Sequence, residues 1–202
     1  MVSFSSLVVR ISELESLTSR IGQLTLPAAL PQPLQPPSGA SFARTLASAT
    51  QLAPAAYGGQ GGRIVAAAQG EVGQGEQPPG SNDGSRIALY RSAVAGAQAG
   101  VPWCAYFASW AAAQAGTPLG DTGAGFGSVA ATADWAARTG QLLPATAVPQ
   151  AGDLILFGTR HLGIVESVNQ DGSLTTIEGN HADAVQRVHR ISGDATGFVR
   201  LG

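Results

Sequence analysis

The order of its patterned segments constrains the fold of this chain more than any other feature, because helical patterns precede strand patterns. Four segments have apolar residues at helical spacing or a high alanine content: 64–72, 85–94, 103–115 and 129–138. Five later segments are short runs rich in valine, isoleucine and leucine: 153–157, 161–168, 174–178, 185–191 and 198–201. Helices followed by strands are typical of an α+β domain with an antiparallel sheet.

The composition excludes several classes of function. The 202 residues fit one compact domain with appendages. The net charge is -2 and the arginines form no basic stripe, so we do not expect nucleic acid as a partner. All 11 basic residues are arginine, which excludes a lysine Schiff base and a phosphate-binding loop of the Gly-Lys-Ser/Thr type. No run of about 18 apolar residues indicates a membrane span.

The first part of the chain has a pattern of its own. Apolar residues recur there at the spacing of an amphipathic helix, which we predict over 1–26: Phe4, Leu7, Ile11, Leu14, Leu17, Ile21 and Leu24. An apolar stripe of this kind must pack against another surface. That surface could belong to a partner protein, to a second copy of the chain or to the chain's own globular part. A Pro/Gly-rich linker with a short helix is predicted over 27–62, and the globular domain over 63–202.

The single cysteine lies where a helix is expected to begin. Cys104 follows Pro102 by two residues, and proline favours the first turn of a helix. Unpaired N–H groups and the positive end of the helix dipole favour a thiolate there, and the same N–H groups can bind an oxyanion. A buried, inert cysteine is the alternative interpretation, since free cysteine is among the most buried residue types.

A thiolate nucleophile needs a base, and the strongest candidate is His161, which opens a predicted strand. If the next turn pairs Asn169 with Gly172, His161 lies opposite Asn180 on the following strand. Glu178 lies two residues away on the same face, so either side chain could hold the imidazole in one tautomer. A slip of one residue in the register would put these groups on opposite faces. A satisfied structural histidine is the alternative for His161.

The two remaining histidines, His181 and His189, are weaker candidates. A zinc site that joins His181 to Cys104, His161 and Glu178 lacks a compact motif of ligand spacing. We therefore predict no metal and no other cofactor.

Several segments around these residues resemble the cysteine- and histidine-dependent amidohydrolase/peptidase (CHAP) family. They are VPWCAYFASWAAAQAG around the cysteine, PQAGDLILFG and RHLGIVESV before and within the histidine strand, and TIEGN in the next strand. With the preceding EVGQGEQPPGSNDGSRIALY, the resemblance extends over about residues 63–202 in the order that the family has. It implies a papain-like α+β fold in which helices precede a small antiparallel sheet, here with an N-terminal helical extension.

The same resemblance implies roles for individual residues. Cys104 would be the nucleophile and His161 the general base and acid, with Glu178 and Asn180 orienting the histidine. The activity implied is that of a hydrolase which cleaves amide bonds of bacterial peptidoglycan, as an amidase or an endopeptidase, through a thioester acyl-enzyme. Three residues near these motifs are candidates for substrate binding: Trp103, Tyr106 and Asn82.

Two other functions stay open at this point. The chain could be a binding or assembly module that retains the fold and acts through its N-terminal stripe, or an amidase on a small peptide. Arg10, Glu13 and Glu15 interrupt the first apolar segment, so no classical signal peptide is expected. We expect action at the cell wall, after non-classical export or upon lysis.

Overall fold

The computed structural model describes residues 59–202, so the predicted helix over 1–26 and nearly all of the predicted linker lie outside the described residues. Four helices come first along the described chain: α3 (Gln60–Gln69), α4 (Ser85–Arg91), α5 (Cys104–Gln114) and α6 (Val129–Arg138). Six strands follow: β1 (Leu142–Pro144), β2 (Leu154–Phe157), β3 (His161–Val168), β4 (Leu174–His181), β5 (Ala184–Arg190) and β6 (Gly197–Val199). The α+β fold is therefore confirmed.

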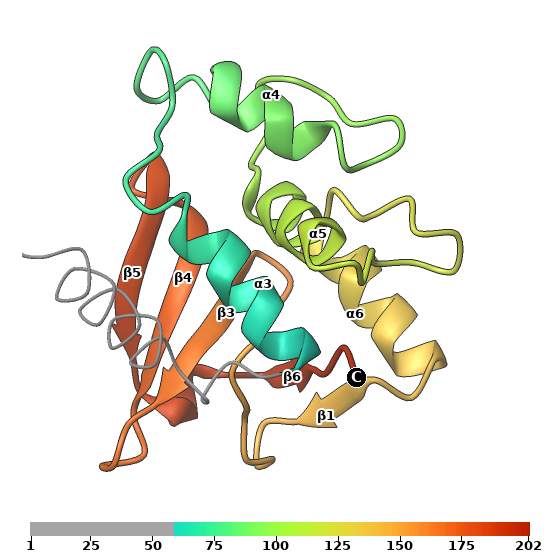
Figure 1. Cartoon of the computed structure of the whole chain (residues 1–202), viewed down its shortest axis with the longest axis vertical. Coiled ribbons are helices and arrows are strands. Elements are labelled where there is room, and N and C mark those ends of the chain that lie inside the picture. The colour runs from blue at the N-terminus through green and yellow to red at the C-terminus, as the bar shows by residue number, and fades with distance from the viewer. Residues whose placement is uncertain (1–58) are drawn as a thin grey trace, which may run out of the picture. The chain divides into compact units, whose positions relative to one another are not determined.

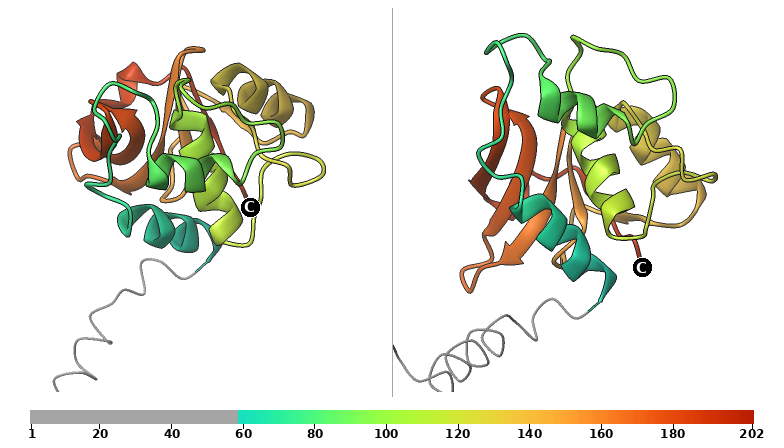
Figure 2. Two further views of the ribbon diagram at one scale, coloured as in Figure 1. Left: turned by 90° about the horizontal axis from the view of Figure 1, so that it is seen from above. Right: turned by 45° about the horizontal axis from the view of Figure 1, so that its top comes forward.

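The strands form one antiparallel sheet in the order β1-β6-β2-β3-β4-β5. β6 returns at the end of the chain to lie between β1 and β2, and β1 is a strand that the sequence patterns did not predict. Figures 1 and 2 show the helices gathered on one side of the sheet. Buried residues of α3 and α5 form one apolar core with residues of β2, β3 and β4. This packing fixes the position of α5, and with it the start of the helix, relative to the sheet.

α5 is buried on almost every side because alanines alternate with large aromatic residues along it. Its close approach to the sheet depends on Gly179 in β4, where an added Cβ would lie 2.6 Å from Phe107 Cβ. Next to α5, Tyr90 contacts the rings of Trp103, Phe107 and Trp110 at centroid separations of 5.2–5.6 Å. These contacts hold the start of α5 against the core.

The start of α3 differs from the sequence-based prediction. α3 begins at Gln60, although the glycines there suggested that the linker continues to residue 62. A Cβ on Gly61 would lie 2.2 Å from Ala151 O, and one on Gly152 would lie equally close to Gly61 Cα. Close approach between backbones, rather than a break in the chain, therefore requires glycine at this point.

The register of β3 and β4 explains how the candidate site is assembled. Ile164 lies opposite Ile177 and Val165 opposite Thr176, which is the register from which the sequence predicts His161 opposite Asn180. Nearer the turn, the register shifts by one residue at an irregularity between Val165 and Ser167. The turn itself pairs Asn169 N–H with Ser173 O at 2.8 Å. The bulge thus brings the strands into the expected register only at the end that carries the histidine.

Candidate active site

Cys104 is the first residue of α5 and is 5% exposed. Its helix has no side-chain cap at the N-terminus and no acidic residue in its first turn. The preceding residue, Trp103, is fully buried, and its Nε1–H donates to Glu76 Oε1 at 2.8 Å. The anchored indole therefore fixes the point at which the thiol emerges from the core.

His161 is the first residue of β3, and its ring lies between three groups. Nε2 is 2.7 Å from Glu178 Oε2, and the ring stacks on Phe157 with a centroid separation of 5.7 Å. Burial by itself lowers the pKa of His161, but the hydrogen bond with Glu178 and the interaction with the Cys104 side chain outweigh burial and raise it to about 9. The imidazole is therefore protonated at neutral pH and connects the thiol to the carboxylate.

Glu178 in β4 is fully buried, yet both of its carboxylate oxygens are satisfied. Arg190 of β5 donates to it through two nitrogens, with Nε 2.8 Å from Oε1 and Nη2 2.6 Å from Oε2. Burial raises the pKa of Glu178, but Arg190, His161 and the Thr176 hydroxyl together lower it to about 2. Gly163 makes room for this carboxylate, because a Cβ there would lie 2.6 Å from Glu178 Cγ.

Arg190 is a residue whose part in the site the sequence did not reveal. Its guanidinium carbon also lies 4.6 Å from the centre of the Phe157 ring, on which His161 stacks. A charged residue near the end of a strand is typical of a solvent-exposed position, so the sequence pattern of β5 did not indicate that Arg190 contacts a buried carboxylate. A buried carboxylate needs a cationic partner, and searching for such a partner of Glu178 would have pointed to Arg190.

His161, Glu178 and His181 place potential metal ligands within 4.8 Å of one another. His181 Nδ1 lies 3.5 Å from the same Glu178 oxygen that His161 contacts. Arg190, however, occupies both oxygens of this carboxylate, and a second cation beside the guanidinium would be repelled. The arrangement therefore favours a hydrogen-bonded ion pair over a metal centre.

The side chain of Asn180 contacts groups other than His161. Its backbone has a φ of 58°, and its side-chain amide lies 3.1 Å from that of Asn82. The amide orientation that satisfies its neighbours sets Nδ2 3.2 Å from Glu76 Oε1 and Oδ1 3.1 Å from Trp103 N. Asn180 thus contacts the groups that precede Cys104, and the expectation that it orients the histidine is corrected.

Glu76 is the second residue that the sequence patterns did not single out. It is 5% exposed and accepts from Trp103 Nε1–H and from the backbone N–H of Asn82, the latter at 2.8 Å. Asn82, itself at a φ of 51°, is thereby held in this network. A lone glutamate in a glycine-rich segment reads as a solvated loop residue, and only the tertiary structure brings it under α5.

A cavity of about 490 Å³ lies beside Cys104. It is lined by Val101, Pro102, Cys104, Gly127, Ser128, Val129, Thr159 and Arg160. A second hollow of about 300 Å³ shares Gly127 and Ser128 with it and reaches Tyr106. The Tyr106 hydroxyl accepts from Gln98 N–H at 3.1 Å. Of the predicted substrate-binding residues, Tyr106 therefore lines a hollow, whereas Trp103 is a core residue with no exposed surface.

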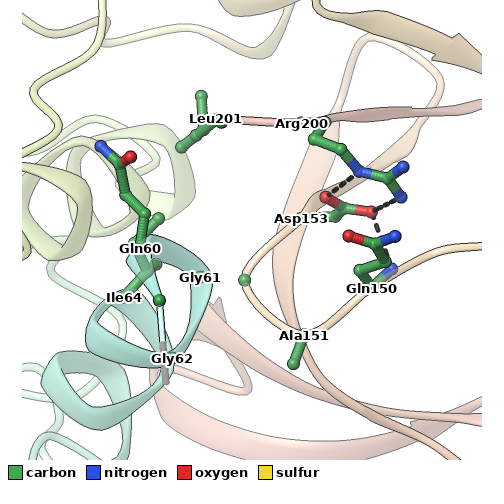
Figure 3. Close-up of a pocket in the computed structure, with 12 residues that line it drawn as sticks. Gln60, Gly61, Gly62, Ile64, Gln150, Ala151, Asp153, Arg200 and Leu201 are labelled. Atoms are coloured by element: carbon green, nitrogen blue, oxygen red, sulfur yellow. Dashed lines mark hydrogen bonds and ion pairs between the residues drawn. The ribbon is translucent and has the colours of Figure 1, made fainter. Parts of the chain in front are cut away.

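Another cavity, of about 270 Å³, lies between the start of α3, the turn at 150–153 and the end of the chain (Figure 3). The ion pair of Arg200 with Asp153, at 2.7 Å, stands on one wall of it. Its lining shares no residue with the cavity beside Cys104.

A cysteine at a helix start, a histidine at a strand start and a buried carboxylate on an α+β scaffold define a protein of the papain-like class. Within this class, residues 96–180 match the CHAP domain family, so the chain carries a CHAP domain and the predicted family is confirmed. CHAP domains are generally hydrolases of the peptidoglycan amidase or peptidase type. No curated protein and no solved structure matches the chain. Among residues 59–202, every helix is too short or too polar to cross a bilayer.

Proposed function

We propose that this protein is a cysteine-dependent peptidoglycan hydrolase that cleaves amide bonds through a thioester acyl-enzyme. Cys104 is the nucleophile, His161 is the general base and acid, and Glu178 holds the imidazole. The observation that carries the proposal is the His161 ring, whose Nε2 lies 2.7 Å from Glu178 Oε2 and whose pKa the neighbouring Cys104 side chain helps to raise. A thiol, an imidazole and an orienting acceptor in series are the components of nucleophilic catalysis by cysteine.

The first half of the reaction forms the acyl-enzyme. The Cys104 sulfur attacks the carbonyl carbon of the amide, and N–H groups at the start of α5 stabilise the oxyanion that develops. Since Nε2 of His161 is held by Glu178, Nδ1 is the nitrogen that gives its proton to the amide nitrogen. The C–N bond then breaks, the amine leaves, and a thioester remains on Cys104.

The second half releases the acyl group. His161 Nδ1 takes a proton from water while the water oxygen attacks the thioester carbonyl. The C–S bond breaks, the product leaves as a carboxylic acid, and the thiolate and imidazolium are restored. Glu178 stays ionised throughout, since its pKa of about 2 lies far below neutral pH.

The central test is the release of muropeptides from purified cell walls. Cys104→Ala is expected to abolish release, because the acyl group then has no sulfur to bind. His161→Ala is expected to do the same, whereas His189→Ala, which changes a histidine outside the site, retains wild-type activity. Undiminished release by the Cys104→Ala variant would reject the proposal.

Mass spectrometry of the products distinguishes the two kinds of amide bond. New termini at the junction of glycan and peptide identify an amidase, and new termini within the peptides identify an endopeptidase. Turnover of a small peptide without any release from walls would favour the amidase on a small substrate instead.

A further inference from the structure

Arg160 differs from the other arginines of the described chain. Six of those between residues 59 and 202 form ion pairs with carboxylates: Arg86, Arg91, Arg138, Arg187, Arg190 and Arg200. Arg63 donates instead to the backbone oxygen of Ala115. Arg160 alone has no hydrogen bond or ion pair with another described residue, and its side chain is exposed. A guanidinium without a partner is free to bind an anion.

The position of Arg160 is set by a tight hairpin. Phe157 and His161 pair at the ends of β2 and β3, and a turn of three residues, 158–160, joins them. Gly158 takes up a φ of 65° in this turn, and its N–H donates to Thr196 Oγ1 at 2.9 Å. Arg160 therefore stands directly before the candidate catalytic histidine, on a loop that is short and anchored.

The same residue lines the cavity beside Cys104. Among the eight residues that line this part of the described structure, Arg160 is the one lysine, arginine or carboxylate residue. Both α5 and α6 begin at its wall, at Cys104 and Val129, and neither helix has an acidic residue in its first turn. The positive ends of two helix dipoles add to the charge of the guanidinium. The cavity is therefore electropositive.

We propose that the cavity receives a peptide segment with a free carboxylate close to the scissile amide, and that Arg160 binds this carboxylate. This inference rests on the proposed function, since it concerns the substrate of the same site. A guanidinium offers two parallel N–H donors that match the two oxygens of a carboxylate, and an uncharged amide cannot replace them. Arg160 thereby selects stem peptides with free carboxyl groups over the same peptides with those groups amidated.

The volume of the cavity agrees with a ligand of this size. About 490 Å³ lies within the range of sites for small ligands, so a short peptide segment fits while the remainder of the wall polymer stays outside. The adjoining hollow beyond Gly127 and Ser128 offers a place for the neighbouring part of the peptide. In the cavity beside Cys104 the other lining side chains are uncharged, which leaves Arg160 as the contact for a carboxylate.

The test compares two soluble stem peptides that differ only in whether their carboxyl groups are free or amidated. For the full-length wild-type protein, kcat/KM is expected to be about five- to tenfold higher for the free form, as for one partly exposed charge-assisted contact. Arg160→Gln should remove this preference by slowing only the free form, and Arg160→Lys should retain part of it. Arg138→Gln is the matched control, since it removes an exposed arginine outside the cavity and should keep the preference.

Binding to the Cys104→Ala variant provides a measurement that does not depend on hydrolysis. Titration calorimetry is expected to give tighter binding of the free form, and the difference should disappear when Arg160→Gln is added. Equal affinity for the two peptides, or a preference that survives Arg160→Gln, overturns the inference. Cleavage that depends on Cys104 but ignores the carboxylate overturns it while the proposed function stands. If the wild-type protein cleaves neither peptide, or cleaves no better than the Cys104→Ala variant, the proposed function is contradicted instead.

Discussion

Two buried carboxylates flank the candidate catalytic pair, and different kinds of partner satisfy them. Glu178, on the histidine side, is bound by the guanidinium of Arg190 through two nitrogens. Glu76, on the cysteine side, accepts from an indole N–H and a backbone N–H, which are neutral donors. The first arrangement keeps a negative charge beside the imidazole, whereas the second holds a backbone in place. The histidine side of the site therefore stabilises a charge, and the cysteine side fixes the position of the backbone before Cys104.

The largest expected effect comes from removing the cation on the histidine side. Arg190→Ala should lower the free energy of unfolding by about 3–5 kcal/mol, because the buried carboxylate of Glu178 would lose the guanidinium that binds both of its oxygens. Chemical denaturation measures the loss. Arg190→Met combined with Glu178→Gln should recover much of it, since the substituted side chains at these two positions carry no charge that needs a partner.

A surface ion pair provides the control for this comparison. Arg138→Ala removes the contact with Asp121, in which both side chains are more than half exposed. The expected loss is below about 1 kcal/mol. Losses of similar size in the Arg190 and Arg138 variants would show that the buried pair has no special part in the fold.

A smaller effect is expected on the cysteine side. Glu76→Gln leaves one acceptor oxygen where two are needed, so either Trp103 Nε1–H or the Asn82 N–H loses its partner. The cost should be about 2 kcal/mol of unfolding free energy, with a lower kcat because the start of α5 is less well held. Denaturation and steady-state kinetics measure both. If kcat is unchanged while stability falls, Glu76 supports only the fold.

The pH profile separates the two carboxylates. Activity should fall as the pH rises through about 9, where His161 loses the proton that the leaving amine requires. Glu178→Gln should move this midpoint down by about one pH unit, equal to about 1.4 kcal/mol, because a neutral amide supports the imidazolium less well. Glu76→Gln should leave the midpoint in place. Identical midpoints in the two variants would contradict the division between charge and position.

The same shifts predict how stability depends on pH. The pKa of His161 is raised from 6.5, so its contribution is fully present below about pH 6.5 and is lost as the pH rises through about 9. The pKa of Glu178 is lowered from 4.5, so its contribution is present above about pH 4.5 and is lost as the pH falls toward 2. Thermal unfolding across this range checks both limbs.

Local pattern was enough to predict most of the fold. β3 has its predicted bounds, α6 likewise, and α5 begins one residue after the predicted start, since each depends on periodicity or on a proline nearby. The closeness of His161 and Glu178 followed from two predicted strands and an assumed register, whereas the closeness of Cys104 to them was implied by the family resemblance. That register holds at the site through a bulge that no sequence pattern indicated.

The parts that could not be predicted depend on partners distant along the chain. Asn180 was expected on the histidine, but its positive φ turns it toward Asn82 and Trp103. Glu76 and Arg190 lie 27 and 12 residues from the groups they bind, Trp103 and Glu178. Propensity and alternation carry no information about such pairs, because burial and charge compensation are decided by the whole fold.

The smallest effect on hydrolysis is expected from deleting residues 1–38. Cys104, His161, Glu178, Glu76 and Arg190, the residues of both halves of the site, all lie in the described part of the chain, and so do the partners of the hydrogen bonds given above for them. The truncated protein should therefore cleave soluble stem peptides with a kcat/KM within about twofold of wild type, a change of less than about 0.5 kcal/mol. A partner or a self-associated state that depends on the predicted helix over 1–26 should be lost, which sedimentation analysis of the two proteins measures. If the deletion abolishes hydrolysis, the first segment contributes to the site, and the division between a charged half and a positioning half is incomplete.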